Sequence, residues 1–151
     1  MSVQAWKLYN KAKNYISGTI NLKTATFDLH LMQSASNFAT LTLSTYGSLT
    51  SQVASAFGYT LAGKALTGVT WSAGASAGQQ KFMASAKTFS ASGGAIANIK
   101  AAVIVARTGA SAKAAANKLL AFCSLSSGQF SISDGNTLTL TPNTLGLFTL
   151  A

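Results

Sequence analysis

The chain has 151 residues and a formal net charge of +9 at pH 7, because 11 lysines and arginines face only two acidic residues. Hydrophobic residues make up 48% of it and charged residues only 9%, so we expect one folded domain with a mostly neutral polar surface, not a disordered chain. No apolar run is long enough to cross a bilayer, and no apolar signal-peptide region follows the N-terminal lysines. We therefore expect neither a membrane association nor a signal peptide.

Residues 5–16 carry apolar side chains at nearly helical spacing, and Gly18 follows them. The pattern predicts a short amphipathic helix, or an arm that docks on a neighbouring molecule. Lysines interleaved with aromatic residues are also found in segments that bind membrane surfaces or nucleic acids. We favour the simpler interpretation that the aromatic rings pack on the domain while the lysines stay in water. The predicted organisation is an N-terminal arm (1–22) followed by a β-sandwich domain (23–151).

Short segments with the pattern of β-strands follow this arm. Phe27, Leu29 and Leu31 alternate with other residues, which predicts a strand with these three side chains on one face. Residues 101–106 form an uninterrupted apolar run rich in β-branched side chains, which is typical of a central strand buried on both faces. Further strands are expected at residues 59–61, 66–71, 80–84, 87–90, 118–125 and 145–150. Long loops are expected at residues 34–50 and 107–117.

The clearest local signal lies near the C-terminus. Two alternating segments, 129–133 and 136–140, flank the dipeptide Asp134-Gly135. Asp-Gly between alternating segments predicts a β-hairpin, because a type I′ turn needs positive φ at both central residues. Pro142 is expected to end the second strand. In all, about eight short strands separated by turn signals indicate an all-β fold, an antiparallel β-sandwich or a barrel.

Few residues in the chain could support catalysis. Asp28 and His30 lie two positions apart, and with a serine or with Cys123 they could in principle form a nucleophile–base–acid set. No nucleophile motif accompanies them, Asp134 is explained by its turn, and the single cysteine lies in an apolar run typical of a buried thiol. Too few ligands are present for a metal site. We expect no enzyme activity, cofactor or metal, with a hydrolase built around His30 as the remaining alternative.

The basic residues are spread along the chain, and ten of the eleven are lysines. Sequence-specific DNA-binding proteins usually concentrate their positive charge and read bases with arginine, and Arg107 is the single arginine here. The pattern favours solubility and attraction to an acidic partner surface. A nucleic-acid-binding module that uses the lysines and aromatic residues is a less favoured alternative.

A surface with many small residues and little charge is expected to pack closely against other protein. Apolar and aromatic side chains outside the clearest strands are the candidates for such contacts. The candidate interface residues are Trp6, Leu8, Tyr9, Tyr15, Ile16, Tyr46, Phe57 and Tyr59.

Several short motifs follow one another in a distinctive order. They are Ala5–Asn10, Phe27–Leu31, Gly58–Thr60, Gly63–Trp71, Ala101–Val105 and Ser133–Leu140. This order, over most of the chain, resembles a group of small tailed-phage virion proteins, the capsid decoration or cement proteins.

The resemblance implies a jelly-roll-like β-sandwich that forms a homotrimer and binds the major capsid protein on the outer capsid surface. It implies a place in the virion, assembled in the host cytoplasm, and no catalytic residues. The chain departs from the group in its scarcity of acids, above all after Gly109, where an aspartate is expected. A tail-associated or fibre-associated jelly-roll protein that binds host glycans is the alternative within the same class.

Overall fold

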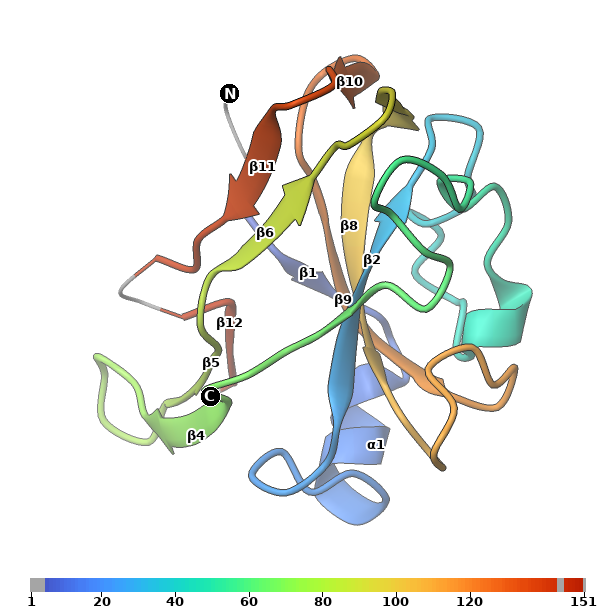
Figure 1. The fold of residues 1–151 in the computed structure, drawn as a ribbon. Helices are drawn as coiled ribbons and strands as arrows, with labels where there is room; N and C mark the ends of the chain where they lie inside the picture. Colours follow the sequence, from blue (N-terminus) through green and yellow to red (C-terminus); the bar gives the residue numbers. More distant parts are fainter. Residues whose placement is uncertain (1–4, 144–145, 151) are drawn as a thin grey trace.

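The computed structural model, which describes residues 5–143 and 146–150, is an all-β sandwich whose paired strands are all antiparallel (Figure 1). Its largest sheet has five strands. Their spatial order is β1 (Lys7–Leu8), β9 (Lys118–Ser124), β8 (Ala101–Ala106), β2 (Phe27–Met32) and β3 (Lys64–Ala65). The sequence therefore predicted the fold class correctly.

Smaller sheets lie across one face of this five-stranded sheet. The three-stranded sheet contains β4 (Thr70–Ala73), β5 (Gln80–Met83) and β12 (Phe148–Leu150). The two-stranded sheets pair β6 (Lys87–Ser90) with β11 (Thr137–Leu140), and β7 (Ile96–Ile99) with β10 (Phe130–Ile132). Figure 1 shows β6 and β11 side by side, to the left of the long β8 and β9. The short helices are α1 (Ala12–Gly18) and the 3₁₀ helix η1 (Tyr46–Ser48).

The core lies between these two layers. Phe27 of β2 contacts Phe82 of β5 edge-to-face, with ring centroids 5.1 Å apart, and Phe82 stacks on Phe148. Every residue of β8 is buried, which confirms the prediction of a central strand covered on both faces. Every residue of β2 is buried as well, including Asp28 and His30. The second face of β2 is therefore covered by protein, not by water.

The N-terminal segment only partly forms the predicted helix. It begins as β1, in which Lys7 and Leu8 pair with Phe122 and Ala121 at the edge of β9, and α1 follows. The helix ends at Gly18, as predicted. A strand replaces the first turn of the predicted helix because the edge of β9 has backbone groups that need hydrogen-bond partners. The spacing of apolar residues within 5–16 carries no information about that edge.

The predicted hairpin at Asp134-Gly135 does not form. The turn exists, since Asn136 N–H donates to the Ser133 carbonyl at 3.0 Å, but β10 pairs with β7 and β11 pairs with β6. Only Gly135 has positive φ (76°), whereas a type I′ turn requires it at both central residues. The Asp134 carboxylate instead accepts a hydrogen bond from Gly93 N–H at 2.8 Å, so the turn is tied to another loop.

Two further predicted strands are wrong in their positions. Residues 59–61 form no strand, and the segment 66–71 contributes only the start of β4. The short strand β3 forms instead at the Gly-Lys position, directly after Gly63, which has a φ of 63°. Positive φ interrupts the regular extended backbone, so Gly63 and Gly68 lie at the two ends of the segment that contains β3.

Replacing Gly63 by alanine is expected to destabilise the fold by about 2 kcal/mol, because it combines an unfavourable φ with a steric clash. A Cβ at this position would lie 2.4 Å from the backbone carbonyl oxygen of Leu29. Gly109→Ala is the matched control, since no atom lies within 4 Å of its added Cβ and its φ is not positive. Urea unfolding of both variants measures the difference; equal stabilities would contradict the expectation.

Candidate functional site

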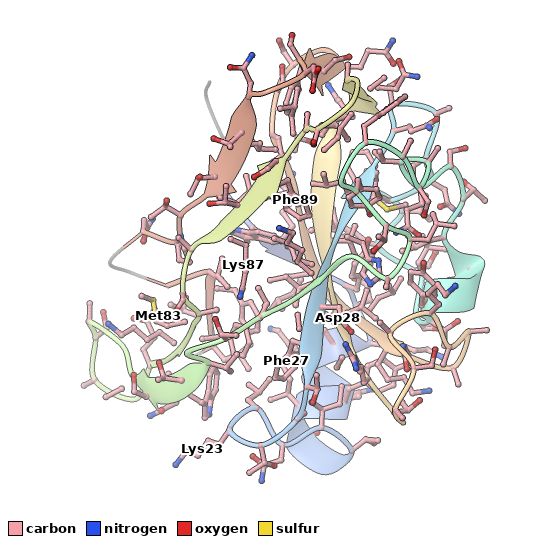
Figure 2. The ribbon with its side chains drawn as sticks, viewed as in Figure 1. Lys23, Phe27, Asp28, Met83, Lys87 and Phe89 are labelled. Carbon is pink, nitrogen blue, oxygen red and sulfur yellow. The ribbon has the colours of Figure 1, made fainter. Side chains whose placement is uncertain are left out.

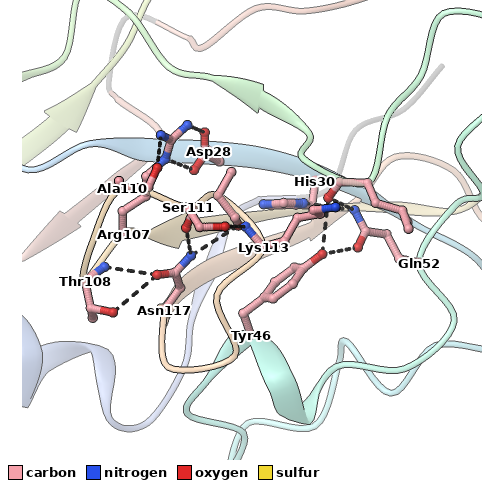
Figure 3. A network of polar contacts seen from close by, with 12 residues as sticks. Asp28, His30, Tyr46, Gln52, Arg107, Thr108, Ala110, Ser111, Lys113 and Asn117 are labelled. Atoms are coloured by element: carbon pink, nitrogen blue, oxygen red, sulfur yellow. Dashed lines mark hydrogen bonds and ion pairs between the residues drawn. The ribbon is translucent and has the colours of Figure 1, made fainter.

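Two long loops cover the outer face of the five-stranded sheet, the face that points away from the smaller sheets. They are the segments 33–63 and 107–117, which join β2 to β3 and β8 to β9. The loops bind each other through backbone hydrogen bonds, from Tyr46 N–H to the Asn117 carbonyl (2.8 Å) and from Gly47 N–H to the Ala115 carbonyl (3.0 Å). Beneath them lies a network of polar side chains (Figure 3).

The first part of this network is an ion pair. Arg107 donates to both oxygens of Asp28, from Nε at 2.6 Å and from Nη2 at 2.7 Å, and the Asp28 side chain is fully buried. Arg107 also donates to the Ala110 carbonyl at 3.0 Å. Because the guanidinium occupies both carboxylate oxygens, Asp28 anchors the start of the second loop to the centre of the sheet.

Asn117 closes the second loop from its other end. Its side-chain oxygen accepts from Thr108 N–H at 3.0 Å, and its amide donates to the Ser111 and Ala112 carbonyls at 2.9 and 3.1 Å. The asparagine is fully buried. It therefore satisfies loop backbone groups that would otherwise be buried without partners, and it gives the loop one defined shape without a helix.

The second part of the network surrounds His30. The Gln52 amide nitrogen lies 2.9 Å from His30 Nδ1, 2.9 Å from the Tyr59 hydroxyl and 3.0 Å from the Leu61 carbonyl. The Tyr46 hydroxyl donates to the Gln52 side-chain oxygen, which fixes the orientation of the amide. The Tyr46 ring also lies against the imidazole, with centroids 4.8 Å apart. Gln52 and His30 Nδ1 therefore form a hydrogen bond whose donor is set by the tautomer of the imidazole.

His30 is held in its uncharged form. Burial lowers its pKa to about 4, and the nearby Asp28 carboxylate offsets only part of that effect. Its Nε2 is buried and has no hydrogen-bond partner among the described residues. A neutral, buried histidine at the junction of a strand and a loop is a packing and hydrogen-bonding element of this network.

The chain does not bring its candidate catalytic residues together. Cys123 lies on the inner face of the sheet, where it shares a cavity wall with Leu29, whereas His30 is the next residue along β2 and faces the opposite side. Burial raises the pKa of the Cys123 thiol to about 12. Both oxygens of Asp28 are bound by Arg107. A set of Cys123, His30 and Asp28 is therefore not assembled.

The candidate interface residues fall into different environments. Tyr9 and Tyr59 are 1% and 3% exposed. Their rings are part of the protein's own core, so they offer no surface to a partner. Tyr46 belongs to the network described above. The four candidates Trp6, Leu8, Tyr15 and Ile16 are partly buried and pack against the core.

Phe57 is the candidate with the largest exposed fraction, 46%, at a backbone position with a φ of 52°. Leu41 and Leu61 are similarly exposed, at 43% and 37%, and lie in the same long loop. Sequence reasoning missed these two leucines because an exposed leucine in a Thr-rich loop has no local signal that separates it from a buried one.

The exposed charge is almost entirely positive. One of the two carboxylate side chains, Asp28, is buried in its ion pair, which leaves Asp134 as the single acidic side chain at the surface. Each of the ten lysines, by contrast, is exposed or only partly buried. Lys118 lies over the Tyr15 ring, 5.2 Å from its centroid, and the exposed Lys11 and Lys13 lie just before and on α1. The folded protein therefore presents a positive surface with little internal compensation.

No family model, curated protein or solved structure matches this chain. Among the described residues, no helix has the length and apolar character required to span a membrane. Within the same residues, no three His, Cys, Asp or Glu side chains gather in a group that could hold a metal ion.

Proposed function

We propose that this protein is a non-enzymatic structural component of a tailed-phage virion that binds the outer surface of the capsid and stabilises it. In this role it is a decoration or cement protein whose partner is the major capsid protein, and it acts as a homotrimer assembled in the host cytoplasm. The order of sequence motifs motivates the phage assignment, and the all-β sandwich is compatible with the jelly-roll-like fold expected from it.

The observation that carries the proposal is the uncompensated positive surface. A fold that buries one of its two carboxylates and exposes its lysines is attracted to an acidic surface over a wide area. Dispersed lysines give such attraction without the base-reading geometry of arginine. Exposed apolar groups on the long loop, above all Phe57, supply area that binding would bury.

A co-sedimentation experiment tests this function. Capsids lacking the protein are mixed with the purified chain at increasing salt, and the bound fraction is measured together with the temperature at which the capsids open. We expect saturable binding that weakens as salt rises, and bound capsids that open at a higher temperature. Absence of binding, or binding to tails and not to heads, would overturn the capsid assignment.

Paired lysine variants locate the contact. Lys11→Gln with Lys13→Gln removes two charges beside the N-terminal helix, and Lys64→Gln with Lys113→Gln removes the same charge from β3 and from the loop 107–117. If the N-terminal segment contacts the capsid, the first pair weakens binding about tenfold and the second less than threefold, because close charge pairs contribute more than distant ones. Tight, salt-sensitive binding to duplex DNA without capsid binding would favour the nucleic-acid alternative.

A further inference from the structure

A partly open pocket of about 220 Å³ lies between the two layers of the sandwich. Leu29, Ile104 and Cys123 line it from the five-stranded sheet, and Lys87 and Leu140 line it from β6 and β11. Most of the remaining wall is apolar, with a few hydroxyl groups. The other lining residues are Trp6, Leu66, Ala84, Ser85, Leu125, Thr139, Thr141, Pro142 and Leu147. The pocket therefore combines the apolar wall of the core with an opening to solvent, which is the usual form of a small-molecule site.

One cationic side chain enters this apolar space. Along β6, Thr88 and Ser90 are exposed while Phe89 is fully buried, so Lys87 is on the core-facing side of the strand together with Phe89. Figure 2 labels Lys87 and Phe89 on this strand, which lies across the sheet that carries Phe27 and Asp28. The Lys87 ammonium donates to the Thr67 hydroxyl at 2.9 Å. This contact is exposed to solvent, so the charged end of Lys87 lies at the edge of the pocket while its alkyl stem lines the apolar wall.

No carboxylate of the described residues pairs with the Lys87 ammonium. Asp28 lies on the opposite face of β2, with both oxygens bound by Arg107. Asp134 is at the turn beyond β10, where it accepts from Gly93. The described residues therefore give Lys87 one neutral hydroxyl and no anion, and the cavity beside it combines apolar walls with a single positive group.

We propose that this cavity binds a short aliphatic carboxylate, with the alkyl chain between the layers and the carboxylate on Lys87. A cavity of roughly 150 Å³ accommodates benzene, and scaling by volume gives about nine non-hydrogen atoms for the present one. This number corresponds to straight-chain acids of about six to eight carbons. Burial of the alkyl chain favours binding, and the ammonium selects an acid over a neutral alcohol or an amine of the same length. The proposal does not rest on the capsid function, although Trp6 belongs both to this pocket and to the candidate interface residues.

Trp6 marks the way into the cavity. It lines the cavity and also a hollow on the outside of the molecule, together with Thr141, Pro142 and Leu147. A residue that contacts both spaces forms part of the wall between them. Its side chain is only partly buried, so Trp6 lies where the pocket meets the surface of the protein.

This position also makes Trp6 a reporter. The chain has two tryptophans, so Trp71→Phe leaves Trp6 as the single source of tryptophan fluorescence. Octanoate, octanol and octylamine are titrated into this single-tryptophan protein at equal concentrations. We expect a saturable change of Trp6 emission with octanoate and affinities at least about tenfold weaker for octanol and octylamine, since neither can form a hydrogen bond between opposite charges with Lys87.

Three variants, each checked for native secondary structure and melting, decide the assignment. Lys87→Met is expected to weaken octanoate binding about tenfold and to abolish the preference over octanol. Lys64→Met is the matched control, because Lys64 donates to the Thr88 carbonyl, lies over the Phe89 ring and does not line the cavity. Ala84→Leu fills part of the cavity without touching the charge, and it should weaken octanoate and octanol alike.

Equal affinity of the parent protein for octanoate and octanol would overturn the proposal, as would unchanged octanoate binding in Lys87→Met. Unchanged binding in Ala84→Leu would show that the ligand lies elsewhere and would also overturn it. If Lys87→Met fails to fold, Lys87→Gln replaces it with the same expected loss. A parent protein whose Trp6 emission responds to none of the three compounds would overturn the proposal as well.

Discussion

Arg107→Ala is expected to lower the free energy of unfolding by about 3–5 kcal/mol, the typical cost of leaving one partner of a buried ion pair alone. Asp28 is fully buried and accepts both of its short hydrogen bonds from Arg107. Without the guanidinium, the carboxylate must stay charged in an apolar setting or take up a proton, and either costs free energy. Chemical denaturation at neutral pH, with circular dichroism as the readout, measures the loss.

The double variant Asp28→Leu with Arg107→Met separates the unpaired charge from lost packing. If the charge causes the loss, removing both partners should recover at least half of it, because apolar replacements of buried pairs are often neutral or stabilising. Arg107→Lys should give an intermediate stability, since an ammonium cannot make the two parallel bonds of the guanidinium. A double variant as unstable as Arg107→Ala would show that the ion pair is not the cause.

The stability of the protein is expected to fall by about 3 kcal/mol as pH decreases from 6.5 to 4, with His30 as the cause. The folded-state pKa of His30 is lowered to about 4 from its ordinary 6.5. Above pH 6.5 the imidazole is neutral in both states, so its full contribution is present. Between pH 6.5 and 4 only the unfolded state binds the proton, which favours unfolding, and below pH 4 the loss levels off.

This chain isolates the effect unusually well, because it has only two acidic side chains and one histidine. His30→Gln should remove the dependence on pH in this window, whatever its effect on stability at neutral pH. Asp134→Asn, at an exposed turn, is the control that should keep it. The free energy of unfolding is measured by urea titration at half-unit pH intervals. The same slope in His30→Gln as in the parent would assign the pH dependence to another group.

The structure also narrows the surface on which a partner can bind. Tyr9 and Tyr59 cannot contact a partner because their rings are buried inside the folded protein. The Tyr59 hydroxyl accepts from Leu31 N–H at 3.0 Å, so it satisfies backbone at a part of β2 that β3 does not reach. In the sequence, an aromatic residue among turn residues resembles an exposed anchor for a partner. Here the Tyr59 hydroxyl instead binds a backbone group at the edge of β2.

Some features of the candidate site were visible in the sequence. Asp28 and His30 stood out as chemically capable side chains on one strand, and the scarcity of acids indicated a positive surface. Their partners were not visible, because Gln52 and Arg107 lie 22 and 79 positions away from His30 and Asp28. Polar residues in long loops have no periodic pattern that predicts which buried group they will bind.

The sequence by itself determined the all-β class and the central strands. Apolar continuity in residues 101–106 and alternation in residues 27–32 are local properties, and burial of those side chains is favourable in almost any arrangement of the sheets. Only the tertiary structure decided which edges pair. The Asp134-Gly135 turn is compatible with a hairpin, yet β10 and β11 found partners in β7 and β6. Strand pairing satisfies backbone groups far apart in the chain, so it depends on which strand edges remain free after the core has formed. The pairing of β6 with β11 is also what places Lys87 beside an apolar cavity.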